Sequence, residues 1–476
     1  MQTLNPKLPL FVDLDGTVIK TDLMFESILQ FFKKNPFAIF LIPFWLLQGR
    51  AYLKHQLAQR VEIAVDLLPL NTEFIAYLRT QEAEGRDIIL ISASNQLPVR
   101  QVSDHLSLFI DAIGSDADHN LKSENKLQRI QQLISKSSFA YAGNSSADLS
   151  VWFEAEEVLM VNCADALESQ LGNKTKTVSR FDPAPAFLAK FWQAMRPHQW
   201  LKNGLIFLPL ILSHQMAQVG LLLQAVIGLI SFSLCASSAY LLNDLLDLNS
   251  DRQHQSKYSR PFASGELSLS YGFLGAPALL FAAILVALLL PTKFLSVLLI
   301  YWLLTCAYSL FLKKMFLLDV LVLAVLYTLR IVAGSAAISV VTSNWLFAFS
   351  MSLFLGLAII KRYSELTNLQ ALGKTTAEGR AYNTGHLKFL SVLGAGAGMA
   401  AVLIFTFYIN APDITGLYST PAILWLICPL LLYLLGRIWL LAYRGKLNED
   451  PVLFAITDRR SQLITLLCGL TIWIAI

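Results

Sequence analysis

The chain has 476 residues, of which 55% are hydrophobic and 15% are charged, and its mean hydropathy is +0.54. A soluble protein of this length would carry about a quarter charged residues, so the composition excludes a wholly soluble protein. The net charge of +4, without a basic stripe interleaved with aromatic residues, gives no support to nucleic-acid binding. The length predicts two or more domains, and the apolar runs of membrane length begin only after about residue 200.

The first part of the chain alternates short apolar runs with helical patterns. The runs lie at 8–12, 87–94, 108–116, 139–144 and 157–162. This alternation predicts a Rossmann-like α/β domain, in which helices cover both faces of a parallel sheet. Ligands bind at the carboxyl ends of the strands in open sheets of this kind, and acidic and polar residues follow the apolar runs here.

The first apolar run ends in Asp13-Leu14-Asp15-Gly16-Thr17. This DxDGT sequence, with the pattern over about residues 8–165, resembles the haloacid dehalogenase superfamily. The resemblance implies a magnesium-dependent phosphatase in which Asp13 attacks phosphorus and Asp15 is the general acid and base. A carboxylate nucleophile divides phosphate-ester hydrolysis into two easier steps.

The same resemblance gives roles to residues after the later strands. Ser92 would hold a phosphoryl oxygen and Lys126 would neutralise charge, with Lys122 the weaker choice. The Mg²⁺ ion would be held by Asp13, Asn144 and Asp148. Because the family usually has an aspartate where this chain has Asn144, one negative charge is lost from the metal site. A working phosphatase and a retained fold with little chemistry therefore both stay open.

Residues 18–86 are long enough for a helical cap on this domain. Within them, "PFAIFLIPFWLLQG" (36–49) is too short to cross a bilayer comfortably. We expect this part of the cap to lie on the membrane surface, and the alternative is a buried cap helix. Residues 171–195 lose periodicity and contain "FDPAPAF", so we interpret them as a linker between domains 1–170 and 196–476.

The second part of the chain predicts an all-α membrane bundle, since a hydrocarbon core of about 30 Å needs about 20 apolar residues per helix. Nine candidate spans are present, at about 204–217, 219–242, 271–291, 294–312, 316–338, 345–360, 388–409, 420–442 and 461–476. The loops on one side hold most of the loop Lys and Arg residues, whereas the opposite loops offer only Lys293. By the positive-inside rule, the basic loops and the N-terminal domain face the cytoplasm, which predicts a multi-pass protein of the cytoplasmic (inner) membrane.

The segment "YLLNDLLDLNSDRQHQSKYSRPFASGE" (240–266) collects charge at the end of one predicted span. Asp244, Asp247 and Asp251 are spaced to share one helix face, with Asn243 beside them. Three carboxylates at a partly dry boundary repel one another, and a divalent cation removes that cost. Mg²⁺ prefers a few carboxylates with waters and phosphate oxygens, so the segment predicts a Mg²⁺–pyrophosphate site rather than a solvated loop. The bases that would contact the phosphates are Arg252, Lys257 and Arg260.

This pattern, NDxxDxxxD followed by K…RP…A.G, resembles the UbiA superfamily of intramembrane prenyltransferases over about residues 190–476. Family members use two acidic motifs to hold two Mg²⁺ ions and a pyrophosphate. The second motif departs from the family here, because Asp319 is followed by Leu323 where aromatic prenyltransferases have a second aspartate. Other features are similar to the bacterial polyprenyl-phosphate phosphoribosyltransferase branch. They are the segments 196–203, 361–366 and 450–459, Tyr308 with Lys313, and Asp319 with Arg330.

That branch implies 5-phosphoribosyl pyrophosphate as the donor and a polyprenyl phosphate as the acceptor, with Asp319 among the catalytic carboxylates. A charge inside a span, such as Arg330, is costly and usually functional. The residues expected to bind substrate are Lys202, Asn203, Asn243, Lys257, Arg260, Tyr308, Lys313, Arg330, Lys361, Arg362 and Glu365. Two alternatives to substrate binding stay open: Lys202 could simply anchor its helix at the membrane surface, and Arg362 could pair with Glu365 for structural reasons alone. The roles of Asp450 and Asp458 stay open too.

The predicted reaction yields a polyprenyl-phosphoryl phosphoribose. The N-terminal domain would then remove the 5-phosphate, giving a lipid-linked pentose donor for envelope glycans. One alternative is a prenyltransferase that moves a polyprenyl chain onto an aromatic ring. A second is a membrane-anchored phosphatase, and a lipid transporter is weaker because an acidic Mg²⁺ segment is not expected in one. The sequence leaves lipid length and oligomeric state open.

Overall fold

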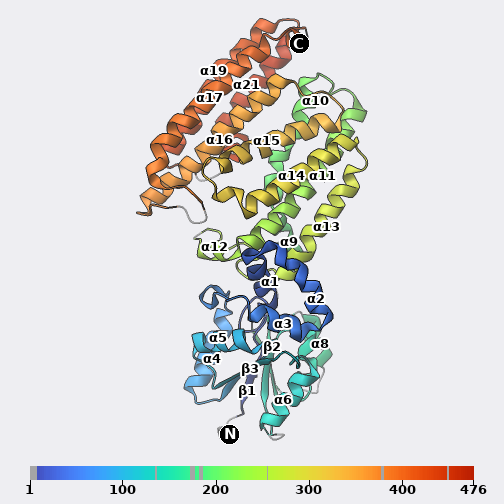
Figure 1. Cartoon of the computed structure of the whole chain (residues 1–476), viewed down its shortest axis with the longest axis vertical. Coiled ribbons are helices and arrows are strands. Elements are labelled where there is room, and N and C mark those ends of the chain that lie inside the picture. Colours follow the sequence, from blue (N-terminus) through green and yellow to red (C-terminus); the bar gives the residue numbers. More distant parts are fainter. Residues whose placement is uncertain are drawn as a thin grey trace. The chain divides into compact units, whose positions relative to one another are not determined.

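The computed structural model describes residues 8–476 except 135–136, 164, 172–176, 182–185, 255, 377–379, 417 and 448–449 (Figure 1). The chain forms two compact units. The first comprises Met1–Ala194 together with Asp244–Leu274, and the second comprises Met195–Asn243 together with Gly275–Ile476. Residues 244–274, which carry the three aspartates and are called the acidic segment below, therefore group with the N-terminal part of the chain.

A six-stranded parallel sheet forms the centre of the first unit, in the order β3-β2-β1-β4-β5-β6. The strands are β1 (Leu10–Val12), β2 (Ile88–Asn95), β3 (Asp111–Ser115), β4 (Ala140–Gly143), β5 (Glu157–Val161) and β6 (Thr177–Phe181). The chain moves outward from β1 to β3 in one direction and from β4 to β6 in the other. The strand order thus reverses between β1 and β4, which is where open sheets leave room for a ligand.

Alternate strand residues enter two separate cores, one on each face of the sheet. Leu10 and Val12 pack with Phe74 and Val99 on one face, and Phe11 packs with Ile130 on the other. The helices that follow the strands are α4 (Thr72–Ala83), α5 (Gln96–Leu106), α6 (Glu124–Ile134), η3 (Ser146–Asp148), α7 (Leu149–Trp152) and α8 (Asp165–Leu171). This is the α/β architecture expected from the sequence.

The interval expected to form a cap is helical. It contains α1 (Leu23–Lys34), η1 (Pro36–Phe40), α2 (Leu41–Leu47), α3 (Arg50–Ala58) and η2 (Val65–Leu67). The Asp22 carboxylate caps α1 by accepting the backbone N–H of Met24 at 2.8 Å. Trp45 joins α2 to a small core with Phe31 and Leu53.

The stretch 171–195, expected to be a linker, is structured over much of its described length. β6 pairs with β5 from Thr177 to Phe181, and α9 (Phe187–Met195) follows. The Phe181 ring packs 5.2 Å from the Phe74 ring. The five-residue run of β6 has a weak periodic signal, and its pairing with the open edge of the sheet makes it a strand. Part of "FDPAPAF", residues 182–185, lies outside the described residues.

Seven helices of the described chain are long and apolar enough to cross a membrane, so the expected count of nine is not confirmed. They are α11 (Val219–Leu246), α13 (Leu269–Ala287), α14 (Thr292–Leu310), α15 (Leu318–Ala337), α16 (Asn344–Ala371), η7 (Thr384–His386) with α17 (Leu387–Ile409), and η8 (Pro421–Leu426) with α19 (Ile427–Tyr443). Shorter elements are α12 (Leu248–Gln253), η6 (Leu312–Lys314), α18 (Pro412–Thr415) and α20 (Pro451–Thr457).

The first and last predicted spans are shorter than expected for physical reasons. Residues 204–217 fall in η5 (Pro197–Phe207), α10 (Leu208–Leu212) and a turn. Pro209 lacks an N–H to donate, and His214 has a left-handed φ of 56° beyond the helix end. The last span is α21 (Arg459–Ala475), and its 17 residues rise about 26 Å, which is short of the roughly 30 Å hydrocarbon core.

α15 is the most buried of the seven long helices, because it contributes residues to two cores of the second unit. Its neighbour α16 continues to Ala371, past the predicted end at 360. Lys361, Arg362 and Glu365 therefore lie on a helix, whereas the sequence predicted a loop. The reason is that Arg362 is paired on the helix with Glu365 and, across to α15, with Asp319, so the charged turns have partners.

Candidate functional sites

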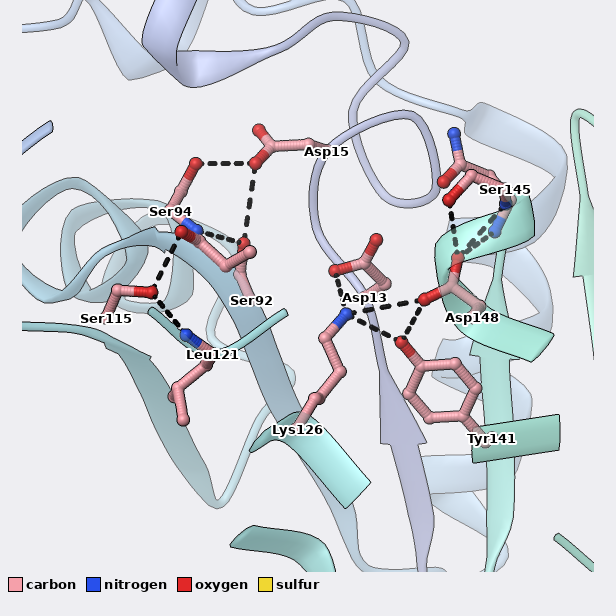
Figure 2. A network of polar contacts seen from close by, with 12 residues as sticks. Asp13, Asp15, Ser92, Ser94, Ser115, Leu121, Lys126, Tyr141, Ser145 and Asp148 are labelled. Carbon is pink, nitrogen blue, oxygen red and sulfur yellow. Dashed lines mark hydrogen bonds and ion pairs between the residues drawn. The ribbon is translucent and has the colours of Figure 1, made fainter. Parts of the chain in front are cut away.

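A buried polar cluster lies at the carboxyl ends of β1 and β4 in the first unit (Figure 2). Lys126, in the first turn of α6, donates from Nζ to Asp13 Oδ1 at 2.8 Å and to the Tyr141 hydroxyl at 2.7 Å. The same nitrogen lies 3.5 Å from Asp148 Oδ1. Lys126 is only 3% exposed, so its charge is directed at these acids. Lys122, the weaker sequence candidate, lines the same cavity.

Burial and charge together set the protonation of this cluster. Burial raises the pKa of Asp13 to about 7, although the nearby Lys126 ammonium opposes the rise. Burial alone would lower the pKa of Lys126, but the carboxylates of Asp13 and Asp148 outweigh it and raise the pKa. The ammonium thus stays charged and can neutralise an anion placed beside Asp13.

Asp15 is held by the end of β2. Its Oδ2 accepts a hydrogen bond from the Ser94 hydroxyl at 2.5 Å and from the Ser92 hydroxyl at 3.4 Å (Figure 2). Its Oδ1 accepts the backbone N–H of Leu23 at 2.9 Å. Ser92, expected to hold a phosphoryl oxygen, is fully buried and also accepts the N–H of Ser94. Burial raises the pKa of Asp15 to about 6, so this carboxyl can carry a proton near neutral pH.

Ser94 and Tyr141 belong to the cluster but were missed from the sequence. Ser94 could have been found, because residues two apart on a strand point to the same face and Ser92 was already a candidate. Tyr141 carries the only side-chain hydroxyl within β4, an otherwise apolar buried strand. Its hydroxyl donates to Asp148 Oδ1 at 2.7 Å, so it fixes the acid that the sequence expected to bind metal.

The three expected metal ligands of this domain differ in how their oxygens are used. Asp13 and Asn144 border a cavity of about 280 Å³, and their oxygens suit a hard cation such as Mg²⁺. Asp148 borders it too, but its Oδ2 already accepts the N–H groups of Asn144 and Ser145 and the Ser145 hydroxyl. In this arrangement Asp148 orients Lys126 and the loop that carries Asn144.

The acidic segment 244–274 forms a second polar cluster within the first unit. α11 ends at Leu246 and α12 begins at Leu248, so the three aspartates lie on two helices with Asp247 at the break. Arg260 Nη1 still bridges Asp244 Oδ1 at 3.1 Å and Asp251 Oδ2 at 2.5 Å. Asp244 and Asp251 are each 2% exposed, so their charges need a cation, and the guanidinium provides one.

The Arg260 guanidinium thus lies between two of the three carboxylates that the sequence expected to hold Mg²⁺. No group of three or more His, Cys, Asp or Glu side chains converges as a metal cluster among the described residues. Asp247 and Lys257 are half-buried in the segment, and Asn243 is half-buried in the last turn of α11.

Arg252 differs from its expected role as a phosphate contact. Its Nη2 lies 2.5 Å from Glu26 Oε1 on α1, and the two side chains are 6% and 2% exposed. Glu26 also accepts the Thr21 hydroxyl at 2.8 Å. This pair was not visible in the sequence, because its members are separated by 226 residues.

In the second unit, Arg362 is the centre of a cluster on α15 and α16. Its Nε donates to Asp319 Oδ2 at 2.6 Å, Nη2 donates to the Tyr308 hydroxyl at 3.1 Å, and Nη1 donates to Glu365. Asp319, expected as a catalytic carboxylate, is fully buried and also accepts the Tyr382 hydroxyl, so here it orients Arg362. Lys313 lies half-buried in η6.

A further cluster of the second unit gathers around Asp450, whose role the sequence left open. Asp450 Oδ2 lies 2.7 Å from Lys361 Nζ and 3.2 Å from Lys202 Nζ, and Oδ1 accepts the Tyr327 hydroxyl at 3.0 Å. Burial opposes ionisation of Asp450, but the two lysines outweigh it and lower the pKa of this carboxyl. Asp458 instead pairs with Arg437 at 2.5 Å and caps α21.

Arg330 lies inside α15 and is 5% exposed. Its Nε donates to Asn203 Oδ1 at 3.0 Å, Nη2 donates to the Tyr301 hydroxyl at 3.1 Å, and Nη1 donates to the Leu326 carbonyl. Its guanidinium carbon also lies 5.0 Å from the centre of the Tyr327 ring. The structure thus brings Lys202, Asn203, Arg330 and Lys361 into neighbouring contacts through Tyr327 and Asp450.

Known proteins match the apolar, C-terminal part of this chain as a family. The model of the UbiA prenyltransferase family matches residues 205–471, which is more than half of the chain. The chain belongs to the UbiA prenyltransferase family. With seven helices of membrane length, this UbiA-family chain is a multi-pass membrane transferase.

Three relatives place the UbiA-family chain among bacterial proteins. It is 37% identical to the y4nM protein of Sinorhizobium fredii over 462 residues, covering 96% of this chain and 89% of the relative. It is 33% identical to nodulation protein NoeC of Azorhizobium caulinodans, over 57% of this chain and 88% of the relative. It is 26% identical to the decaprenyl-phosphate phosphoribosyltransferase of Mycobacterium tuberculosis, over 60% of this chain and 93% of the relative. The y4nM match extends over both units, so the combination of the two in one chain is shared with that relative.

Proposed function

We propose that this UbiA-family protein transfers the 5-phosphoribosyl group from phosphoribosyl pyrophosphate to a polyprenyl phosphate, with Mg²⁺. We further propose that its N-terminal domain removes the 5-phosphate, giving a polyprenyl-phosphoryl ribose. Support comes from the relatives named decaprenyl-phosphate phosphoribosyltransferase and from the cationic groups of the second unit. The enzyme would act at the cytoplasmic face of the inner membrane on lipid-borne substrates.

The charge around α15 and α16 carries the transferase proposal. Lys202 and Lys361 both pair with Asp450, and Arg362 pairs with Asp319 and Glu365. Arg330 hydrogen-bonds the neutral side chains of Asn203 and Tyr301. Leu323 stands where a prenyl-pyrophosphate enzyme would add a second aspartate. A donor with a 5-phosphate in addition to its pyrophosphate needs these extra cations, whereas a prenyl chain does not.

In the proposed transfer, the bond between the anomeric carbon and the pyrophosphate oxygen breaks, and an oxygen of the lipid phosphate bonds to that carbon. Pyrophosphate leaves with the bonding electron pair. Asp244, Asp247 and Asp251 would hold Mg²⁺, which neutralises charge on the leaving group when bound. Arg260 and Lys257 would contact the phosphates, and Arg362 would be one of the substrate-binding residues. The lipid phosphate is already ionised, so no strong base is required.

In the proposed hydrolysis, Asp13 Oδ attacks the 5-phosphorus and the ester oxygen leaves with a proton from Asp15. Water then attacks the phosphoryl–aspartate and returns a proton to Asp15. Asp13 and Asn144 would hold Mg²⁺, which supplies charge neutralisation, while Lys126 would neutralise the phosphoryl oxygens. Ser92 and Ser94 hydrogen-bond Asp15 and would keep it oriented toward the leaving group.

The test uses purified full-length protein with labelled phosphoribosyl pyrophosphate, polyprenyl phosphate and Mg²⁺, with lipids analysed by mass spectrometry. The wild type should form the dephosphorylated lipid-linked ribose. Asp13→Asn should accumulate the lipid that retains its 5-phosphate, whereas Asp244→Asn should form neither. Consumption of labelled polyprenyl pyrophosphate instead would favour the prenyltransferase alternative. Hydrolysis of phosphate esters that Asp244→Asn leaves unchanged, with neither labelled donor consumed by the wild type, would favour the membrane-anchored phosphatase.

A further inference from the structure

Two adjoining cavities lie in the first unit around the proposed phosphatase residues. One, of about 280 Å³, contains Asp13 and Lys126. The other, of about 360 Å³, is bordered by Lys20, Glu266 and Ser268. Asp15, Asp22 and Asn144 line both cavities, so they form the boundary between them. The larger cavity falls in the range of about 300–1,000 Å³ that is usual for small-molecule sites.

The wall formed by residues 265–268 belongs to the acidic segment, which is held firmly within the first unit. Arg252, which pairs with Glu26, also donates from Nε to the Ala263 carbonyl at 3.4 Å, two residues before this wall. Gly265 has a φ of +76°, and a Cβ there would lie 2.8 Å from the Lys20 carbonyl oxygen, so only glycine permits this approach. Glu266 pairs at 2.8 Å with Lys190 of α9.

The boundary position of Asp15 gives each cavity a chemical role. A general acid must contact the oxygen of the leaving group, and the nucleophile must contact phosphorus. With phosphorus beside Asp13 in the smaller cavity, the leaving group therefore extends past Asp15 into the larger one. The carboxylates of Asp22 and Glu266 and the Ser268 hydroxyl line that space, and such groups suit a hydroxylated leaving group.

We propose that residues 265–268, with Lys20 and Asp22, form the leaving-group subsite of the phosphatase and select sugar phosphates. This inference rests on the proposed phosphatase function and deepens it. Glu266 accepts hydrogen bonds from sugar hydroxyls. Lys20 offers a positive charge to a second phosphate carried by the same sugar. A segment contiguous with the proposed metal site of the transferase thus sets the specificity of the other reaction.

The test compares two phosphate esters on the full-length protein in detergent, ribose 5-phosphate and 4-nitrophenyl phosphate. Glu266→Gln keeps the shape of the side chain but removes its charge. We expect KM for ribose 5-phosphate to rise about tenfold, while kcat and all constants for 4-nitrophenyl phosphate stay near wild type. Glu82→Gln, on the exposed surface of α4, is the matched control and should change neither substrate.

A second variant changes the wall without straining its backbone. Ser268→Ala removes a hydroxyl that lines the larger cavity, and it should also raise KM for ribose 5-phosphate selectively. Unchanged KM ratios in both variants, with wild-type hydrolysis of both esters, would overturn the subsite and leave the phosphatase in place. If the wild type hydrolyses neither ester, both the phosphatase and its subsite are overturned.

Discussion

Asn144 packs its amide against Gly16, so closely that a Cβ at position 16 would lie 1.9 Å from the amide nitrogen. An aspartate at 144 would add a further carboxylate to the cavity that Asp13 lines. We predict that Asn144→Asp tightens Mg²⁺ binding by the N-terminal domain about tenfold, because the site gains a negative charge. A titration of phosphatase activity against Mg²⁺ measures this. Gln132→Glu on α6 adds the same charge elsewhere, and if both variants titrate alike, residue 144 does not face the ion.

Arg362 uses three parts of its guanidinium for three different partners. A lysine keeps the charge but cannot reproduce this planar fork. We predict that Arg362→Lys lowers the transferase kcat/KM about 100-fold, equivalent to about 2.7 kcal/mol. The measurement is initial-rate kinetics with labelled donor. Arg444→Lys, at an exposed position after α19, should behave as wild type. Wild-type kinetics for Arg362→Lys would show that charge alone is needed there.

At the scale of elements, α16, α17 and α19 pack through small residues. A Cβ at Gly394 would lie 2.4 Å from Trp439 and 2.8 Å from Ile359, whereas a Cβ at Gly396 meets nothing within 4 Å. We predict that Gly394→Val destabilises the bundle by about 1–3 kcal/mol, because overpacking forces these helices apart. Thermal stability in detergent, followed by size-exclusion chromatography after heating, measures the loss. Gly396→Val on the same helix is the control, and equal losses would contradict this packing.

The cap helix α2 is apolar on both faces. Ala38, Ile42 and Trp45 of η1 and α2 pack into the cap core, whereas the outer side chains Phe37, Phe40, Phe44 and Leu47 are 64–86% exposed. An apolar stripe of this kind flanked by bases, here Lys34 and Arg50, is typical of a helix lying in a bilayer surface.

We predict that a fluorophore attached at Leu47→Cys, in a background without the native cysteines and in nanodiscs, is quenched by brominated lipids. The same label at Asp104→Cys, near the end of α5, should be quenched only by aqueous iodide. Equal iodide quenching at both positions would place the cap away from lipid.

At the scale of the whole molecule, residues 1–194 and 244–274 share one unit. The distribution of loop Lys and Arg residues predicts that this unit lies on the cytoplasmic side and that the loop between α15 and α16 lies on the opposite side.

We predict that Val341→Cys, at a position 92% exposed, reacts with a membrane-impermeant maleimide on intact cells. Tyr258→Cys, in the acidic segment and 59% exposed, should react only after lysis. The reverse labelling pattern would contradict the cytoplasmic placement of the N-terminal domain.

The sequence by itself determined the parallel α/β sheet, the apolar helices and the identity of several clustered side chains, because periodicity and motif spacing are local properties. It located Asp13, Asp15 and Lys126 at one sheet edge, and Asp244 with Asp251 near Arg260. It overestimated the number of spans, since run length does not reveal the turn at His214 or the 3₁₀ winding of η5.

Only the tertiary structure decided which charges meet. Arg252 pairs with Glu26, Asp450 pairs with Lys202 and Lys361, and β6 joins the edge of the sheet. Each depends on residues distant in the chain, and the free energy of such contacts comes from burial and geometry that no local pattern encodes. For the same reason, the cavity beside Glu266 could not be read from the sequence.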